Sequence, residues 1–103
     1  MMAFGLSEHT LQILHNFFAT QADIDCVKIY GSRALGTYKK GSDIDFAVYT
    51  HVSKDLSAPL LSALDALPTP YLFDVTDYNH LNHESLKQHI DQEGAVFFTQ
   101  KIL

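Results

Sequence analysis

The sequence predicts a small α/β domain, of the α+β kind, in which helices pack against one mixed β-sheet. The length of 103 residues is that of a single domain. Apolar residues recur at helical spacing in three segments, and short β-rich segments lie between them. Because no repeat, linker or low-complexity tract interrupts the chain, we expect residues 1–103 to form one domain.

Three segments have the apolar spacing of amphipathic helices. The first covers residues 7–20, with Ser7 as its expected N-cap. The second and third are expected to start at the caps Ser57 and Asn82 and to end near residues 67 and 93. A further short helix is expected over residues 33–35.

Four shorter segments have the composition of β-strands. They are residues 26–30, 43–49, 71–76 and 95–98. Helices and strands alternate along the chain, and we therefore expect a mixed sheet with helices against it.

The composition excludes several classes of function. The chain has 7 Lys plus Arg and 12 Asp plus Glu, and its net charge of −5 argues against general binding of nucleic acid. Its longest apolar stretches are far shorter than the roughly 20 residues that span a bilayer. The N-terminus lacks the pattern of a signal peptide and Cys26 is the only cysteine, so we expect a cytoplasmic protein.

The segment from Gly31 to Asp45 carries the residues that most indicate chemistry. Gly31 and Ser32 follow a predicted strand and precede the short helix, so that backbone N–H groups and a hydroxyl can bind phosphate. From these two residues alone, an ordinary strand-to-helix turn is the simpler interpretation. A Walker A loop is excluded because Thr37 follows Gly36 where that loop requires Lys.

Asp43 and Asp45 are two residues apart at the start of an apolar strand, and we expect their carboxylates on one face. Two such carboxylates repel each other and resist desolvation, and a divalent cation removes both costs. Mg²⁺ suits this pair best, because it prefers carboxylate oxygens and completes its shell with water and substrate phosphate. For an isolated Asp-x-Asp, the alternative is two acids in a solvated turn.

A third acid, Asp74, lies within a predicted core strand. An unpaired carboxylate there is costly, and such residues usually have a partner or a function. If its strand lies beside the one that carries Asp43 and Asp45, all three acids meet at one end of the sheet. Asp77 is the rival third acid, but it has the opposite parity and is interpreted as a turn or capping residue.

Together these residues resemble a family signature. Gly31-Ser32, ten further residues and then Asp43-x-Asp45, with a later strand that carries Asp74, are similar to the pattern of the minimal nucleotidyltransferases. These are small members of the DNA polymerase beta-like nucleotidyltransferase superfamily. The resemblance extends from about residue 25 to residue 98 and implies the nucleotidyltransferase fold.

The resemblance implies a Mg²⁺-dependent transfer of a nucleoside monophosphate, AMP from ATP, to a hydroxyl with release of pyrophosphate. It implies that Asp43, Asp45 and Asp74 are catalytic and hold two Mg²⁺ ions, with Mn²⁺ as the alternative ion. The residues that it implies for nucleotide binding are Gly31, Ser32, Arg33 and Ser42. Lys39 and Lys40 either neutralise triphosphate charge or belong to a solvated basic turn.

Members of this family often occur with a separate helical partner of the HEPN type, and in some pairs the transferase is an antitoxin that modifies the partner with AMP. The resemblance therefore implies a HEPN-type partner, and a homodimer or a heterotetramer is compatible with it. The alternative from another class is a non-catalytic binding module that masks a helical partner. Antibiotic nucleotidylation is disfavoured because no acceptor-binding domain is visible in the sequence.

Overall fold

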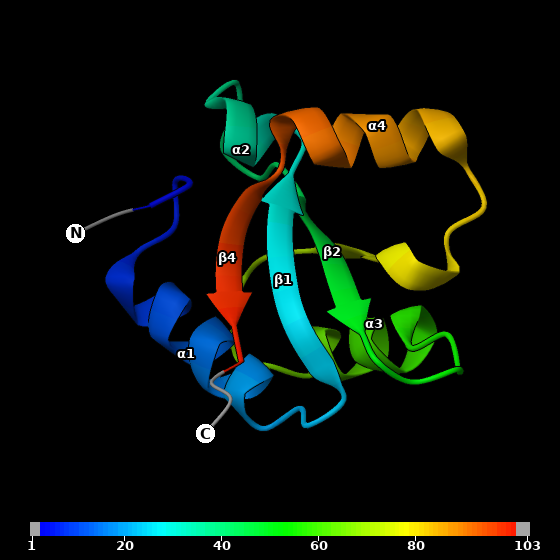
Figure 1. Cartoon of the computed structure of the whole chain (residues 1–103). Coiled ribbons are helices and arrows are strands. Elements are labelled where there is room, and N and C mark those ends of the chain that lie inside the picture. Colours follow the sequence, from blue (N-terminus) through cyan, green and yellow to red (C-terminus); the bar gives the residue numbers. More distant parts are fainter. Residues whose placement is uncertain (1–2, 101–103) are drawn as a thin grey trace.

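The computed structural model describes residues 3–100, which form one sheet with helices on both of its faces (Figure 1). All the predicted helices and strands are present in the predicted order, and their ends differ from the prediction by up to two residues. In chain order the elements are α1 (Glu8–Ala19), β1 (Ile24–Tyr30), α2 (Ser32–Leu35), β2 (Ile44–Thr50), α3 (Ser57–Asp65), β3 (Phe73–Asp77), the 3-10 helix η1 (Tyr78–His80), α4 (Glu84–Glu93) and β4 (Ala95–Thr99).

The sheet has the strand order β3-β2-β1-β4 and mixed strand directions, as predicted. β1 pairs antiparallel with β2 and β4, whereas β2 pairs parallel with β3, which follows it through α3. Asp45 lies directly opposite Asp74 in the parallel pair and opposite Tyr30 in the antiparallel pair. The topology thus brings the end of β1 and the starts of β2 and β3 to one end of the sheet.

The main core lies between the sheet and the helices α1 and α3. Alternate residues of β2, namely Ile44, Phe46 and Val48, are fully buried there with side chains from both helices. On the opposite face, a smaller cluster forms around Ala47 of β2 and Ile90 of α4. Residue parity along β2 and β3 therefore decides which face of the sheet each side chain occupies.

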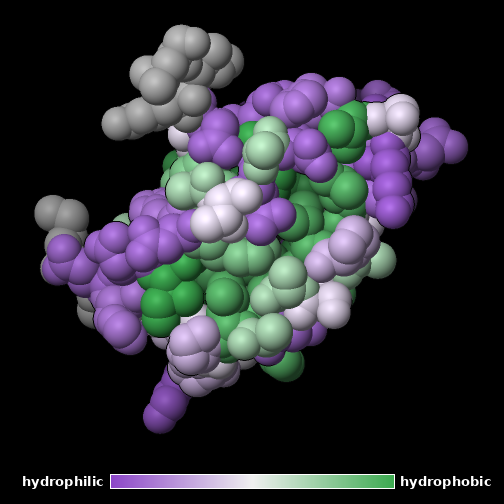
Figure 2. All heavy atoms as spheres, turned by 90° about the horizontal axis from the view of Figure 1, so that it is seen from below, coloured by the Kyte–Doolittle hydropathy of each residue, from purple (hydrophilic) through white to green (hydrophobic). Residues whose placement is uncertain are grey.

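Apolar side chains also reach the surface of the molecule. Seen from below in the orientation of Figure 1, they gather over the middle of the surface, and hydrophilic side chains border them (Figure 2). Within residues 3–100, the exposed large hydrophobic side chains are Leu35, Tyr38, Leu72 and Val96. Over the same range, none of the helices has the length and apolar character needed to cross a membrane.

The Ser7 cap of α1 is confirmed, but the other two predicted helix caps are wrong. Ser57 is already the first residue of α3, and both its N–H and its hydroxyl donate to the Asp55 carboxylate, at 2.9 and 2.7 Å. The cap of α4 is His83 and not Asn82, because a ring nitrogen of His83 accepts a backbone N–H of the first helical turn at 3.1 Å. In both places a neighbouring side chain competes successfully for the orphan N–H groups of the helix start.

Candidate active site

Three acidic residues share one end of the sheet. Asp45 and Asp74 alternate with core residues of β2 and β3, so both carboxylates point to the face that carries α4. They are direct neighbours across the parallel pair of strands. Asp43 is exposed and precedes the first residue of β2. The predicted neighbourhood of the two strands is confirmed, whereas a shared site of all three acids stays a prediction.

The acids interact electrostatically. Burial raises the pKa of Asp45 above its ordinary value of 3.8, and the negative charges of Asp74 and Asp43 raise it further, whereas Arg33 acts in the opposite direction. Asp45 is therefore an acid whose ionised form the site disfavours. Either a proton or a cation relieves the repulsion at this position.

The chemistry of these side chains fits a divalent cation. Within residues 3–100, no three His, Cys, Asp or Glu side chains are already gathered around a metal position. The donor set is nevertheless one of hard carboxylate oxygens, and the half-buried Asp45 gains most from a neighbouring positive charge. Asp43, Asp45 and Asp74 are the residues that would hold such an ion.

Gly31 provides the space that the Asp45 carboxylate occupies. It precedes α2 with a φ of +71°, a conformation that side chains disfavour, and a Cβ at this position would overlap Oδ2 of Asp45. Ser32 is the first residue of α2, and no side chain caps this helix end. The N–H groups at the start of this short helix therefore lack a side-chain acceptor and lie close to Asp45. The binding of a nucleotide by Gly31 and Ser32 stays a prediction.

Arg33 occupies an environment that the sequence did not predict. Its guanidinium is buried, where Nε and Nη2 donate to the carbonyl oxygen of Ser42 at 3.2 and 2.8 Å and Nη1 donates to that of Phe4 at 3.0 Å. The rings of Tyr38 and Tyr71 lie 5.2 and 5.0 Å from it. These contacts connect three segments of the chain, and the predicted contact of Arg33 with a nucleotide stays a prediction.

The loop before β2 contains the remaining predicted residues. Oγ of Ser42 accepts a hydrogen bond from the backbone N–H of Lys39 at 2.8 Å, which closes a turn over residues 39–42. Lys39 and Lys40 are exposed, and neither forms an ion pair within residues 3–100. Both ammonium groups are therefore available to an anionic ligand, while nucleotide binding by Ser42 stays a prediction.

Tyr30 is a neighbour of the acids that was not among the predicted site residues. Its ring is buried, and its hydroxyl lies 3.2 Å from that of Thr76. Burial raises the pKa of the Tyr30 hydroxyl, and the charges of Asp74 and Asp45 raise it further. The sequence signal for Tyr30 was its place directly before Gly31, at the end of the strand that leads into the site.

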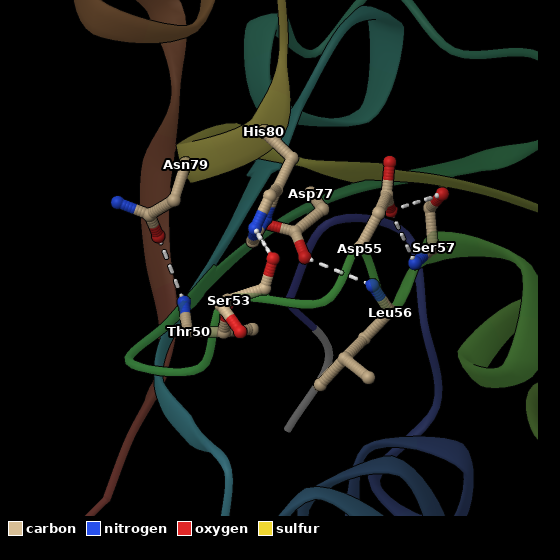
Figure 3. Close-up of polar contacts among 8 residues, drawn as sticks. All are labelled: Thr50, Ser53, Asp55, Leu56, Ser57, Asp77, Asn79 and His80. Carbon is tan, nitrogen blue, oxygen red and sulfur yellow. Dashed lines mark hydrogen bonds and ion pairs between the residues drawn. The ribbon is translucent and has the colours of Figure 1, made fainter.

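Asp77 has a structural environment on the opposite face of β3. Its buried carboxylate accepts a hydrogen bond from the backbone N–H of Leu56 at 3.0 Å and lies 3.1 Å from Nδ1 of His80 (Figure 3). Nε2 of His80 donates to the carbonyl oxygen of Ser53 at 2.8 Å. Asp77 ends β3 as predicted and occupies the N-cap position of η1, but its side chain makes no capping hydrogen bond there, so the predicted capping role is not confirmed.

The family to which the chain belongs follows from a direct comparison. Residues 12–102 match the family model described as Polymerase beta, Nucleotidyltransferase. This match covers most of the sequence, and the chain therefore belongs to the nucleotidyltransferases of the polymerase beta-like superfamily. The family resemblance that the motifs indicated is confirmed. A search of the curated proteins returned no match.

Three solved structures have a similar fold. A toxin–antitoxin with AMP-PNP is 23% identical over 92% of this chain and 76% of that chain, with a TM-score of 0.63. A mutant of the toxin–antitoxin MntA-HpeT is 22% identical over 93% and 76%, with a TM-score of 0.62. A Sulfolobus solfataricus protein described as a nucleotidyltransferase is 18% identical over 87% and 77%, with a TM-score of 0.54. These likenesses confirm the predicted nucleotidyltransferase fold.

Proposed function

We propose that this chain transfers a nucleoside monophosphate, AMP from ATP, to a hydroxyl acceptor and releases pyrophosphate. The observation that carries the proposal is the direct pairing of Asp45 with Asp74 across neighbouring strands, beside the turn at Gly31. The raised pKa of Asp45 supports it, because groups with perturbed ionisation concentrate at functional sites. Membership of the nucleotidyltransferase family supports the class of reaction.

The proposed reaction needs positioning and charge more than covalent chemistry from the protein. The acceptor oxygen forms a bond to the α-phosphorus, while the bond from that phosphorus to the oxygen bridging to the β-phosphate breaks. Divalent metal ions, when bound, stabilise charge on the attacking and leaving oxygens. Asp43, Asp45 and Asp74 would hold these ions, and Asp74 would also accept the proton of the acceptor hydroxyl. The first-turn N–H groups at Ser32 would bind the β- and γ-phosphates.

We further propose that the acceptor hydroxyl belongs to a separate helical protein of the HEPN type in a toxin–antitoxin pair. Two structures with a similar fold are toxin–antitoxin structures, and one of these contains AMP-PNP. Asp43 and Asp74 are both exposed, so this end of the sheet is open to a second chain. Such a chain would supply the acceptor and cover the reacting groups.

The test uses the purified chain, a HEPN-type partner, MgCl₂ and ATP labelled on its α-phosphate. We expect covalent label on the partner with the wild type, and loss of that label with Asp45→Asn. Asp65→Asn, which changes an exposed acid on α3, is the matched control and should label the partner like the wild type. Undiminished labelling by Asp45→Asn would contradict the proposal. Stable binding of the partner without any label would favour the non-catalytic module that masks it.

A further inference from the structure

A cavity of about 510 Å³ lies beside the loop that leads into β2. Its volume falls within the range of roughly 300–1,000 Å³ that is usual for small-molecule sites. The side chains that matter in its lining are Arg33, Tyr38, Lys39, Lys40, Pro70 and Tyr71. Asp43, Asp45 and Asp74 do not line it, so the cavity is separate from the acid cluster.

Asp45 and Asp74 point away from the core against which the wall of this cavity packs. Tyr71 packs against the main core, which lies under α1 and α3. Gly5, which also lines the cavity, directly precedes Leu6 of the same core. Asp45 and Asp74 alternate with residues of that core and point to the face of α4. A ligand in the cavity would therefore not occupy the position of the reacting groups.

The local charge of the cavity is opposite to that of the whole chain. The chain has a net charge of −5, yet three of its 7 Lys and Arg residues line this one cavity: Arg33, Lys39 and Lys40. The two lysines are exposed and form no ion pair in the described part of the chain, residues 3–100. An anion at this position meets two unneutralised ammonium groups.

The walls of the cavity are suited to a flat ring. The rings of Tyr38 and Tyr71 flank the buried Arg33 guanidinium, and Pro70 adds apolar surface. Tyr38 is 39% exposed, so that part of its ring is open to a further stacking partner. An exposed tyrosine ring can stack on any nucleobase, because every base has a flat aromatic face.

From the rings in the wall and the lysines beside them, we propose that this cavity is a second ligand site and binds a nucleoside monophosphate. The base stacks on Tyr38, and the phosphate lies between Lys39 and Lys40. Binding is non-covalent and does not depend on the proposed transfer reaction. Because Arg33 in the cavity wall holds the carbonyl oxygen of Ser42, an occupant also restrains the loop that leads to the acids.

The test is a titration of the ¹⁵N-labelled chain with AMP in EDTA, followed through the backbone amide shifts. We expect saturable shifts at residues 38–41 and at Tyr71, and much smaller ones at Gly31, Ser32 and Asp74. Adenosine alone and inorganic phosphate alone should each bind about tenfold or more weakly than AMP, since each makes only half of the contacts.

Two double variants distinguish AMP binding at this cavity from a general attraction of AMP to positive charge on the chain. The double variant Lys39→Gln/Lys40→Gln should weaken AMP binding about tenfold, while the charge-matched Lys54→Gln/Lys87→Gln leaves it unchanged. The proposal is overturned if the two double variants weaken AMP binding equally. It is also overturned if the shifts are confined to the Gly31 turn and the acids, or if no shift saturates at millimolar AMP. Asp45→Asn should still bind AMP, so that a failure of this site and a failure of transfer are distinguishable.

Discussion

Asp74 and Asp77 are three residues apart on β3, and their carboxylates differ in burial and in the groups that they contact. Asp77 is buried, accepts the N–H of Leu56 and pairs with His80. Asp74 is exposed and forms no hydrogen bond or ion pair within residues 3–100, although it lies directly opposite Asp45. A buried carboxylate that accepts a backbone N–H and faces a histidine ring stabilises the fold, whereas carboxylates set against one another do not. The contrast separates a structural acid from one placed for binding.

Replacement by alanine should lower the transfer rate at Asp74 and the stability of the fold at Asp77. For Asp74→Ala we expect about a 10³-fold lower rate of nucleotidyl transfer, because metal-assisted charge stabilisation is worth several kcal/mol. Its melting temperature should equal or exceed that of the wild type, since a repulsive charge is removed. The rate of label transfer from ATP and the melting temperature are the two measurements. An active Asp74→Ala would remove this acid from the site.

For Asp77→Ala we expect the reverse. Loss of the carboxylate leaves the N–H of Leu56 and the ring of His80 without their partner, at a cost of about 2 kcal/mol in the free energy of unfolding. The folded fraction should transfer nucleotide at close to the wild-type rate. Urea unfolding followed by circular dichroism measures the loss. Unchanged stability together with lost transfer would mean that the roles of Asp74 and Asp77 are exchanged.

Arg33→Lys tests whether the cation near the acids is structural. Lysine keeps the charge but cannot reproduce the paired donation to Ser42 and the contact with Phe4, so we expect a loss of about 1–2 kcal/mol in unfolding free energy. Urea unfolding and the KM for ATP should be measured together. A raised KM with unchanged stability would instead favour the direct contact with nucleotide that the sequence predicted.

His80 should give the smallest effect, and a pH-dependent one. The neighbouring carboxylate of Asp77 and the hydrogen bond with Ser53 raise the pKa of His80 above its ordinary value of 6.5. The stabilisation is therefore complete below pH 6.5 and is lost as the pH rises through the folded-state pKa. The melting temperature of the wild type should fall relative to that of His80→Gln between about pH 6 and about pH 9. The difference is read against this variant because His51 and His89 also contact acids. A constant difference over this range would contradict the pairing.

The contrast between the two acids was predictable in part. Parity along a single strand separated Asp74 from Asp77, and the spacing of Asp43 and Asp45 indicated a shared face, because strand geometry is local and periodic. The partner of Asp77 was not predictable. His80 meets it through the turn of η1, and the periodicity of the sequence does not describe that turn.

Arg33 shows the same limit at the site itself. Its place after Ser32 is visible in the sequence, but its burial depends on carbonyl groups of Phe4 and Ser42. Those residues belong to loops before α1 and β2, and no periodic pattern connects them. The predicted caps Ser57 and Asn82 were wrong for a related reason. Which side chain accepts a free N–H at the start of a helix depends on loop geometry, and here Asp55 and His83 do so.

The most direct test of the acid cluster is the melting temperature in EDTA and in Mg²⁺ for the wild type, Asp45→Asn and Asp65→Asn. We predict that Asp45→Asn melts at a higher temperature than the wild type in EDTA, because its repulsion with Asp74 and Asp43 is removed. Mg²⁺ should raise the melting temperature of the wild type and of Asp65→Asn, but not that of Asp45→Asn. An Asp45→Asn variant that melts lower in EDTA and responds to Mg²⁺ like the wild type would contradict a cation site built on these three acids.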